Sequence, residues 1–237
     1  MLSKKIKFIP NSQFIDECID PPVPARKMIP EWYKKSTRFV HGNEYELKNK
    51  EENFMDIKSC IPFFDSLNSG YIQKLWFDMY IESDDSDAEI HCRMDENKTI
   101  NRRPDNSSKY FPTPYWCTKS KFTFLYPYSI LTPPGYSTIF TQPFNQFDTP
   151  LVFLTGVVDT DKIIQNGNYP FFVRKNFKGV VKAGTPIIQM IPFKRDSWSS
   201  SKETFENNSL DLNRVKLRVA EVYGYYKNNI WNRKEYL

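Results

Sequence analysis

The chain has 237 residues, of which 40% are hydrophobic and 16% aromatic, and its formal net charge is +5. This length fits one β-rich domain, or one domain with an appendage. No stretch is apolar for long enough to cross a bilayer, and the basic start, Met1–Lys7, lacks the apolar segment of a signal peptide. We therefore expect a protein of the cytoplasm without membrane partners.

Composition favours strands over helices. The 19 Phe and 14 Tyr fit a pleated surface, and 17 Pro against 8 Gly predict rigid connections and few long helices. The four cysteines lie far apart in sequence, and only two histidines are present. Structural zinc sites need closely spaced ligand pairs, so we expect free thiols and no metal site.

Nucleic acid is not expected as a partner, because 33 basic and 28 acidic residues leave only a mild excess of positive charge. The basic clusters are short, whereas nucleic-acid binders concentrate them in a stripe. Aromatic residues are interleaved with lysines at Trp32–Lys35 and Tyr225–Lys227. Such rings could stack on bases, but mixtures of this kind are more often solvated faces whose rings turn inward.

Residues 1–55 predict an extended arm with one short helix. Pro21–Pro24 forces an extended backbone. Ile29–Lys35 is typical of a short helix with Pro30 in its first turn, and residues 41–53 are charged and loop-like.

Residues 56–109 predict a helix, a strand and an exposed loop. Apolar residues at helical spacing run from Ile57 to Leu67, with Pro62 near the start and a Gly-containing stop at Asn68–Gly70. Tyr71–Glu82 alternates as a strand does. Ser83–Ser108 is acidic and then basic, and we expect a long exposed loop or an excursion from the sheet. Its carboxylates could suit calcium, but the turn Gly and the distal Glu of an EF-hand loop are missing, which favours a solvated loop.

The β core is expected over residues 110–195. Residues 196–237 are expected to form a linker followed by a helix over 215–226. Strands are expected at 121–126, 137–141, 151–158 and 170–174 and on both sides of Ala183-Gly184. The predicted fold is mainly β. We expect an antiparallel β-clip or jelly-roll-like sandwich in one compact domain, with the arm and a few short helices packed on it.

Three segments of the β core follow one another in a recognisable order. They are the turn Thr132–Gly135, the hairpin sequence Gly156–Asp161, and Val180–Ile191 with a central Gly. In this order they resemble the core of the dUTPase and dCTP deaminase family. The same span resembles, more closely, a family of bacterial and phage proteins without an assigned function.

The resemblance implies a dUTPase-like fold and a nucleotide pocket. By position it implies that Asp159 is the acid that activates a water molecule, a general-base role. It implies a ligand-binding role for five further residues: Gly156, Val158, Thr160, Asp161 and Gln189. It implies no certain cofactor. Mg²⁺ would be needed only with a bound nucleotide, whose phosphate oxygens would hold it.

The sequence departs from the enzyme pattern at several points. Gln142–Gln146 stands where the enzymes carry Arg-Ser-Gly, and Lys162 stands where an aromatic residue stacks on the sugar. The glutamate of the deaminase branch is missing near Val173 and Arg174. A structural alternative is therefore strong: the two aspartates of the hairpin cap a tight turn.

We thus expect a β protein that binds a small ligand at a degenerate dUTPase-like site, without catalysis. The resemblance to phage proteins suggests that a phage encodes it. Its partner would be a nucleotide or a similar small polar molecule, and a homo-oligomer is left open. One alternative is a virion, coat or assembly protein, located in the virion instead of the host cytoplasm. The other is an active, Mg-dependent nucleotide hydrolase that uses Asp159 as base.

Overall fold

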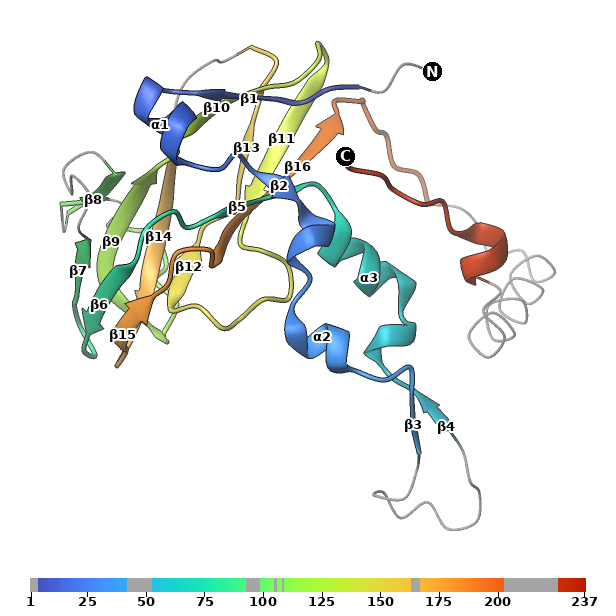
Figure 1. Cartoon of the computed structure of the whole chain (residues 1–237), viewed down its shortest axis with the longest axis horizontal. Coiled ribbons are helices and arrows are strands. Elements are labelled where there is room, and N and C mark those ends of the chain that lie inside the picture. Colours follow the sequence, from blue (N-terminus) through green and yellow to red (C-terminus); the bar gives the residue numbers. More distant parts are fainter. Residues whose placement is uncertain are drawn as a thin grey trace.

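A computed structural model describes residues 4–41, 53–92, 99–104, 106–107, 109–162, 167–202 and 226–237. Within these residues the fold is mainly β, with a few short helices, and every strand pair is antiparallel. The predicted fold class is therefore confirmed. Figure 1 shows most of the strands gathered in one body, with helices α2 (Glu31–Lys35) and α3 (Ile61–Asn68) to one side of it. The pair of strands β3 (Phe39–His41) and β4 (Asn53–Met55) projects beyond these helices.

The largest sheet has five strands in the order β13-β11-β16-β5-β2. Its central pair, β11 and β16, runs from Tyr136 opposite Lys194 to Thr141 opposite Gln189. The strands of this sheet are β2 (Val23–Pro24), β5 (Tyr71–Lys74), β11 (Tyr136–Thr141), β13 (Gly156–Val158) and β16 (Pro186–Lys194). The short strand β13 forms one edge of the sheet, and this edge carries the hairpin sequence.

The second sheet has four strands in the order β12-β14-β9-β8. On its inner face, the Phe171 ring stacks on Phe122 at 5.5 Å and contacts Phe153 at 5.1 Å between ring centroids. The strands are β8 (Ile100–Arg102), β9 (Cys117–Leu125), β12 (Leu151–Phe153) and β14 (Asn168–Arg174). Part of the Phe content of the chain thus lies in ring contacts on one face of this sheet.

The third sheet, β15-β6-β7, continues the first sheet across a bend. It consists of β6 (Met79–Ser83), β7 (Ala88–Cys92) and β15 (Lys178–Val181). The links β5–β6 and β15–β16 run side by side: Leu75 N–H donates to the Thr185 carbonyl at 2.8 Å, and Gly184 N–H donates to the Leu75 carbonyl at 2.7 Å. These bonds join the two sheets into one curved ribbon.

Two predicted strands are each divided between two sheets. The stretch Tyr71–Glu82 forms β5 and β6, since the chain bends at Leu75–Asp78. Alternating burial continues through the bend, so the sequence pattern alone does not reveal it. The stretch Leu151–Val158 forms β12 and β13. Leu154 N–H still bonds to Pro170 of β14 at 3.0 Å, whereas the hydroxyl of Thr155 bonds that of Thr141 of β11.

The prediction of one exposed loop over Ser83–Ser108 is wrong for part of that range. Strand β7 pairs with β6, and β8 pairs with β9. Ala88 is buried although charged residues flank it, and these charges masked the strand pattern. Residues 93–98 of this range lie outside the described residues.

The amino-terminal arm packs on the body of the same chain. Its first strand, β1 (Lys7–Pro10), pairs with β10 (Tyr128–Leu131), a strand that the sequence analysis did not predict. The arm also holds α1 (Gln13–Cys18), which was not predicted, and the short 3-10 helix η1 (Ala25–Met28). The predicted short helix is α2 (Glu31–Lys35), which begins one residue after Pro30.

Helix α3 (Ile61–Asn68) follows a 3-10 turn, η3 (Ile57–Ser59), so the predicted helix is two elements, with Pro62 in the first turn of the second. The chain leaves α3 through Gly70, whose φ is +73°. Before these helices, β3 (Phe39–His41) pairs with β4 (Asn53–Met55). The predicted loop 41–53 lies mostly outside the described residues, as does nearly all of the predicted helix 215–226.

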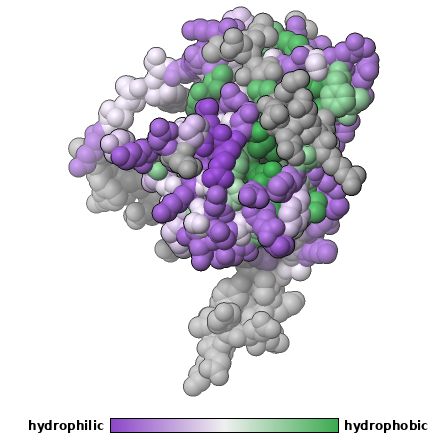
Figure 2. All heavy atoms as spheres, turned by 90° about the vertical axis from the view of Figure 1, so that its left-hand side faces the viewer, coloured by the Kyte–Doolittle hydropathy of each residue, from purple (hydrophilic) through white to green (hydrophobic). Residues whose placement is uncertain are grey.

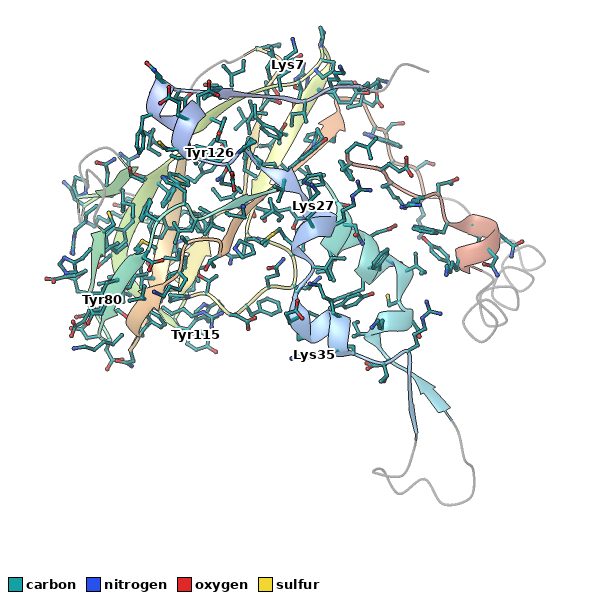
Figure 3. The ribbon with its side chains drawn as sticks, viewed as in Figure 1. Lys7, Lys27, Lys35, Tyr80, Tyr115 and Tyr126 are labelled. Atoms are coloured by element: carbon teal, nitrogen blue, oxygen red, sulfur yellow. The ribbon has the colours of Figure 1, made fainter. Side chains whose placement is uncertain are left out.

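The core lies between the sheets and draws side chains from all three of them. Tyr126 is fully buried there, and its hydroxyl donates to Oε1 of Gln73 at 3.3 Å. Figure 3 shows Tyr126 inside the body and Tyr115 at its margin. The face on the β6–β7–β8 side is largely hydrophilic, with apolar side chains gathered in places (Figure 2).

The described carboxy-terminal residues pack against α3 and β5. They begin with a single π-helical turn, η4 (Tyr226–Ile230). Trp231 Nε1 donates to Asp65 of α3 at 2.9 Å, and the ring of Tyr236 meets that of Tyr71 at 5.9 Å. Among the described residues, no helix combines the length and apolar character that a membrane crossing requires.

Candidate functional site

The hairpin sequence and the Pro-Gly turn meet at one corner of the largest sheet. Val158 lies opposite Thr138 in the β11–β13 pair. The chain then turns, with Thr160 N–H bonded to the Val158 carbonyl at 3.0 Å. Thr132 N–H donates to the Thr160 carbonyl at 3.2 Å. The corner therefore brings together two segments that the sequence analysis selected separately.

Thr160, a predicted ligand-binding residue, is buried inside this corner. Its hydroxyl lies 2.8 Å from the hydroxyl of Thr132 and 2.8 Å from that of Thr138. All three side chains are buried. Because a hydroxyl has one donor and two acceptor positions, these contacts occupy most of its bonding capacity. Thr160 thus connects the turn to β11, and its hydroxyl is enclosed by these side chains.

Asp161 forms the strongest ion pair of the corner. Its carboxylate accepts a bond from Gly135 N–H at 2.7 Å and is held by both terminal nitrogens of Arg195, with Nη1 at 2.8 Å. Its side chain is only 6% exposed. The Arg195 bond is the main cause that lowers the pKa of Asp161 to about 2, against the opposing effect of burial. Asp161 therefore remains charged and internally bonded.

Arg195 is the residue of this corner that the sequence analysis missed. It follows the last residue of β16, and its N–H donates to the Gly135 carbonyl at 2.9 Å. Its Nη1 also donates to the Tyr136 carbonyl at 2.9 Å and to the Ser137 hydroxyl at 3.0 Å. The only sequence signal is a basic residue at the end of a strand, and this does not identify its carboxylate partner.

Asp159, the predicted catalytic acid, is more accessible than Asp161, with a side chain that is 45% exposed. The Ser137 hydroxyl donates to its Oδ1 at 2.6 Å, and Arg195 Nη1 lies 3.3 Å from the same oxygen. The Ser137 bond is the first cause of a lowered pKa, and the charges of Arg195 and Lys162 lower it further. A general base works best with a pKa near the operating pH, and these neighbours move the pKa of Asp159 away from neutral pH.

The other predicted residues of the hairpin lie on the exposed edge of the sheet. Gly156 is exposed, and a Cβ added there would meet no atom within 4 Å. Val158 is half-buried against the core. Among the described strands, β13 has a partner on one side only, so its other edge is open.

Gln189 is not part of this corner. In β16 it lies three residues before Pro192, which is opposite Thr138, so about 10 Å of strand separates the two places. Its side chain is buried and bonds only backbone groups. Oε1 accepts from Phe144 N–H at 2.8 Å, and Nε2 donates to the carbonyls of Ser66 and Ser69 at 3.0 and 2.7 Å. Gln189 thereby holds the end of α3 against the body.

The carboxylates of the corner bond mainly within the protein. Both oxygens of Asp161 bond to Arg195, and Oδ1 of Asp159 faces Ser137 and Arg195. Within the described part of the chain, no group of three or more His, Cys, Asp or Glu residues is placed to hold a metal ion. The four cysteines are free thiols, as predicted.

The Asp161–Arg195 pair predicts a specific response to acid. Because the folded-state pKa of Asp161 is about 2, below the value of an unfolded aspartate, its stabilising effect is complete above about pH 4. It is lost as the pH falls through about 2. We expect Asp161→Asn to lower the urea midpoint at about pH 7 and to reduce the further loss on acidification. Equal acid sensitivity of wild type and variant would contradict this assignment.

Comparisons with known proteins give only distant likenesses. No protein-family model and no curated protein matches the chain. Among solved structures, a mutant dUTPase from phage phi11 of S. aureus, described with a structural Mg(II) ion, aligns at 11% identity and a TM-score of 0.31. This alignment covers 59% of the present chain and 84% of the phage protein.

A second similar structure is a mutant dUTPase from Staphylococcus bacteriophage 80alpha with dUpNHpp. It aligns at 10% identity and a TM-score of 0.32, over 88% of the present chain and 91% of that protein. Superpositions this loose do not show a common family or a common site. The mainly antiparallel β fold rests on the strand pairs of the chain itself.

Proposed function

We propose that the chain is a binding protein for a nucleotide or a similar small polar molecule, built on a dUTPase-like corner that has no catalytic role. The observation that carries the proposal is the bonding of Asp159. The carboxylate that the resemblance assigns to catalysis accepts a bond from Ser137 and lies beside Arg195, with a lowered pKa. The ordered sequence match supports the ligand class, and this bonding supports the loss of catalysis.

The open edge of β13 is the proposed binding surface. Its backbone N–H and C=O groups can form hydrogen bonds with the edge of a base, as they would with another strand. Gly156 leaves the approach to this edge free of side-chain atoms. The side chains of Asp159 and Arg195 are both partly exposed nearby, at 45% and 30%. Any Mg²⁺ would enter with the ligand, held by its phosphate oxygens.

Thermal unfolding with dUTP or dCTP, with and without Mg²⁺, tests the proposal. A ligand that binds only the folded state raises the melting temperature as RT ln(1 + [L]/Kd). We expect a rise for wild type and for Asp159→Asn, with no release of pyrophosphate by either. Gly156→Leu should fold normally and lose the rise, because its side chain covers the edge.

The matched control is Val180→Thr, an exposed position on β15, which should keep the ligand response. Unchanged melting temperatures at about millimolar nucleotide, well above ordinary Kd values, would contradict the proposal. Turnover by wild type that disappears in Asp159→Asn would show instead that the corner is an active site. An assembly role remains the alternative proposal, which predicts a large particle mass in light scattering.

A further inference from the structure

Four aromatic side chains lie exposed within one short segment. Tyr110 is 91% exposed, Tyr115 84%, Trp116 48% and Phe111 44%. The rings of Tyr115 and Trp116 meet edge to face at 4.8 Å between centroids. The ring of Tyr110 has a lysine ammonium, that of Lys109, 5.8 Å from its centroid. Tyr110 and Tyr115 therefore bury little surface on folding, and packing does not explain why rings stand at these two positions.

Backbone and ring contacts place this segment on the outer side of β14. Phe111 stacks on Phe172 at 6.0 Å between centroids. Lys175 N–H donates to the Trp116 carbonyl at 3.0 Å, and Arg174 lies opposite Cys117 in the β14–β9 pair. The exposed rings thus lie beside two cations at the end of β14. We call Tyr110, Phe111, Tyr115, Trp116, Arg174 and Lys175 the aromatic–basic surface.

Arg174 lacks a partner for one of its donors. Its Nε is buried without a hydrogen-bond partner. The side chain as a whole is partly exposed, and its charge can attract an anionic ligand. The nearby carboxylates are otherwise engaged: Asp84 accepts from the N–H groups of Ser86 and Asp87, and Asp85 from Asn176.

The sequence around the rings adds positive charge. Residues 99–121 contain one acidic residue, Asp105, and five basic residues: Arg102, Arg103, Lys109, Lys119 and Lys121. Arg102 is paired with Asp87 at 2.9 Å, and Arg103 and Lys119 are exposed. With Arg174 and Lys175 there are seven basic residues, against four aspartates once Asp84, Asp85 and Asp87 of the neighbouring turn are counted. This excess of positive charge favours a partner with negative charge.

We infer that the aromatic–basic surface binds single-stranded nucleic acid. Such binders combine exposed rings, on which bases stack, with cations that follow the phosphates. The bases would stack on Tyr110, Tyr115 and Trp116, while Arg174 and Lys175 contact phosphate oxygens. Duplexes hide their base faces, so the surface selects unpaired strands. This inference is independent of the nucleotide site at β13, which lies in another sheet.

Fluorescence anisotropy of a labelled oligothymidylate of about 20 nucleotides, longer than the usual footprint, tests the inference. We expect binding at low salt that weakens as salt rises. Tyr110→Ala and Tyr115→Ala should each weaken it about 5- to 150-fold, the effect of one lost stacking contact. Arg174→Gln should reduce the slope of log K against log salt by about 0.7, the value for one phosphate contact on a single strand.

Two substitutions after β16 provide matched controls. Trp198→Ala removes a ring that is 91% exposed, and Lys202→Gln removes an exposed cation. Both should leave oligothymidylate affinity unchanged, as should Gly156→Leu at the β13 edge. Oligouridylate in place of oligothymidylate distinguishes RNA from DNA as the natural source of the strand.

Three outcomes would overturn the inference. They are the absence of an anisotropy change at low salt, an equal loss in Trp198→Ala and Tyr115→Ala, and tighter binding of a duplex than of the single strand. A fall in particle mass for Tyr115→Ala without effect on oligonucleotide affinity would instead identify a contact between protein copies. Circular dichroism of each variant checks that folding is intact.

Discussion

Replacing Gly70 with alanine is expected to be among the most destabilising single substitutions in the chain. Gly70 has a φ of +73°, and an added Cβ would lie 1.9 Å from the carbonyl oxygen of Met190 in β16. The atom in the way is backbone within the central strand, so it cannot turn aside as a side chain would. Backbone strain and overpacking together predict a loss of about 2 to 6 kcal/mol in the free energy of unfolding, measured by urea denaturation.

Gly135→Ala is the matched control. Gly135 also has a positive φ, +83°, but an added Cβ there meets nothing within 4 Å. Only the backbone strain remains, about 1 to 2 kcal/mol. If both variants lose the same stability, then the close contact between Gly70, just after α3, and the Met190 carbonyl of β16 adds nothing to the cost of the substitution.

Gln189→Met is expected to cause the second large loss. The substitution keeps the length of the side chain and removes three hydrogen bonds, leaving Phe144 N–H and the carbonyls of Ser66 and Ser69 without their partner. Each unsatisfied buried group costs about 1 to 3 kcal/mol, and partial relaxation reduces the sum to about 3 to 5 kcal/mol. Urea midpoints measure the loss.

Gln146→Met serves as its control, since the Gln146 amide makes a single long bond of 3.4 Å to the Met28 carbonyl. We expect it to change stability by less than about 1 kcal/mol. Gln189 was predicted to bind a ligand. A Gln189→Met variant of full stability that fails only in nucleotide binding would support that role over the structural one.

The strand-rich class and most strands of residues 110–195 could be predicted because their alternation and turn residues are local signals. Lys121–Tyr126 and Ser137–Thr141 fall within or nearly within observed strands. The sheet to which a strand belongs is not a local signal. Leu151–Val158 is apolar except at Thr155 and Gly156, yet its two halves pair with different strands.

The candidate site could be predicted in part for the same reason. Asp159, Thr160 and Asp161 lie together because they are neighbours in sequence, and the Pro-Gly turn was placed beside them by the resemblance. Arg195 could not be predicted. It reaches Asp161 only because β16 runs antiparallel to β11 and ends beside Gly135. Charge compensation of this kind depends on strand register, which single sequences do not specify.

The pairing of β1 with β10 affects the order in which the chain can fold during synthesis. Asn11 and Ser129, at this junction, bond side chain to side chain across 118 residues of sequence. The arm is made first, but its partner strand leaves the ribosome long afterwards, so the arm has no native partner during most of translation. Contacts of such long range form slowly and leave strand edges exposed meanwhile. A bulky fusion at the amino terminus should therefore delay the last step of folding, whereas one at an exposed loop of the body should not.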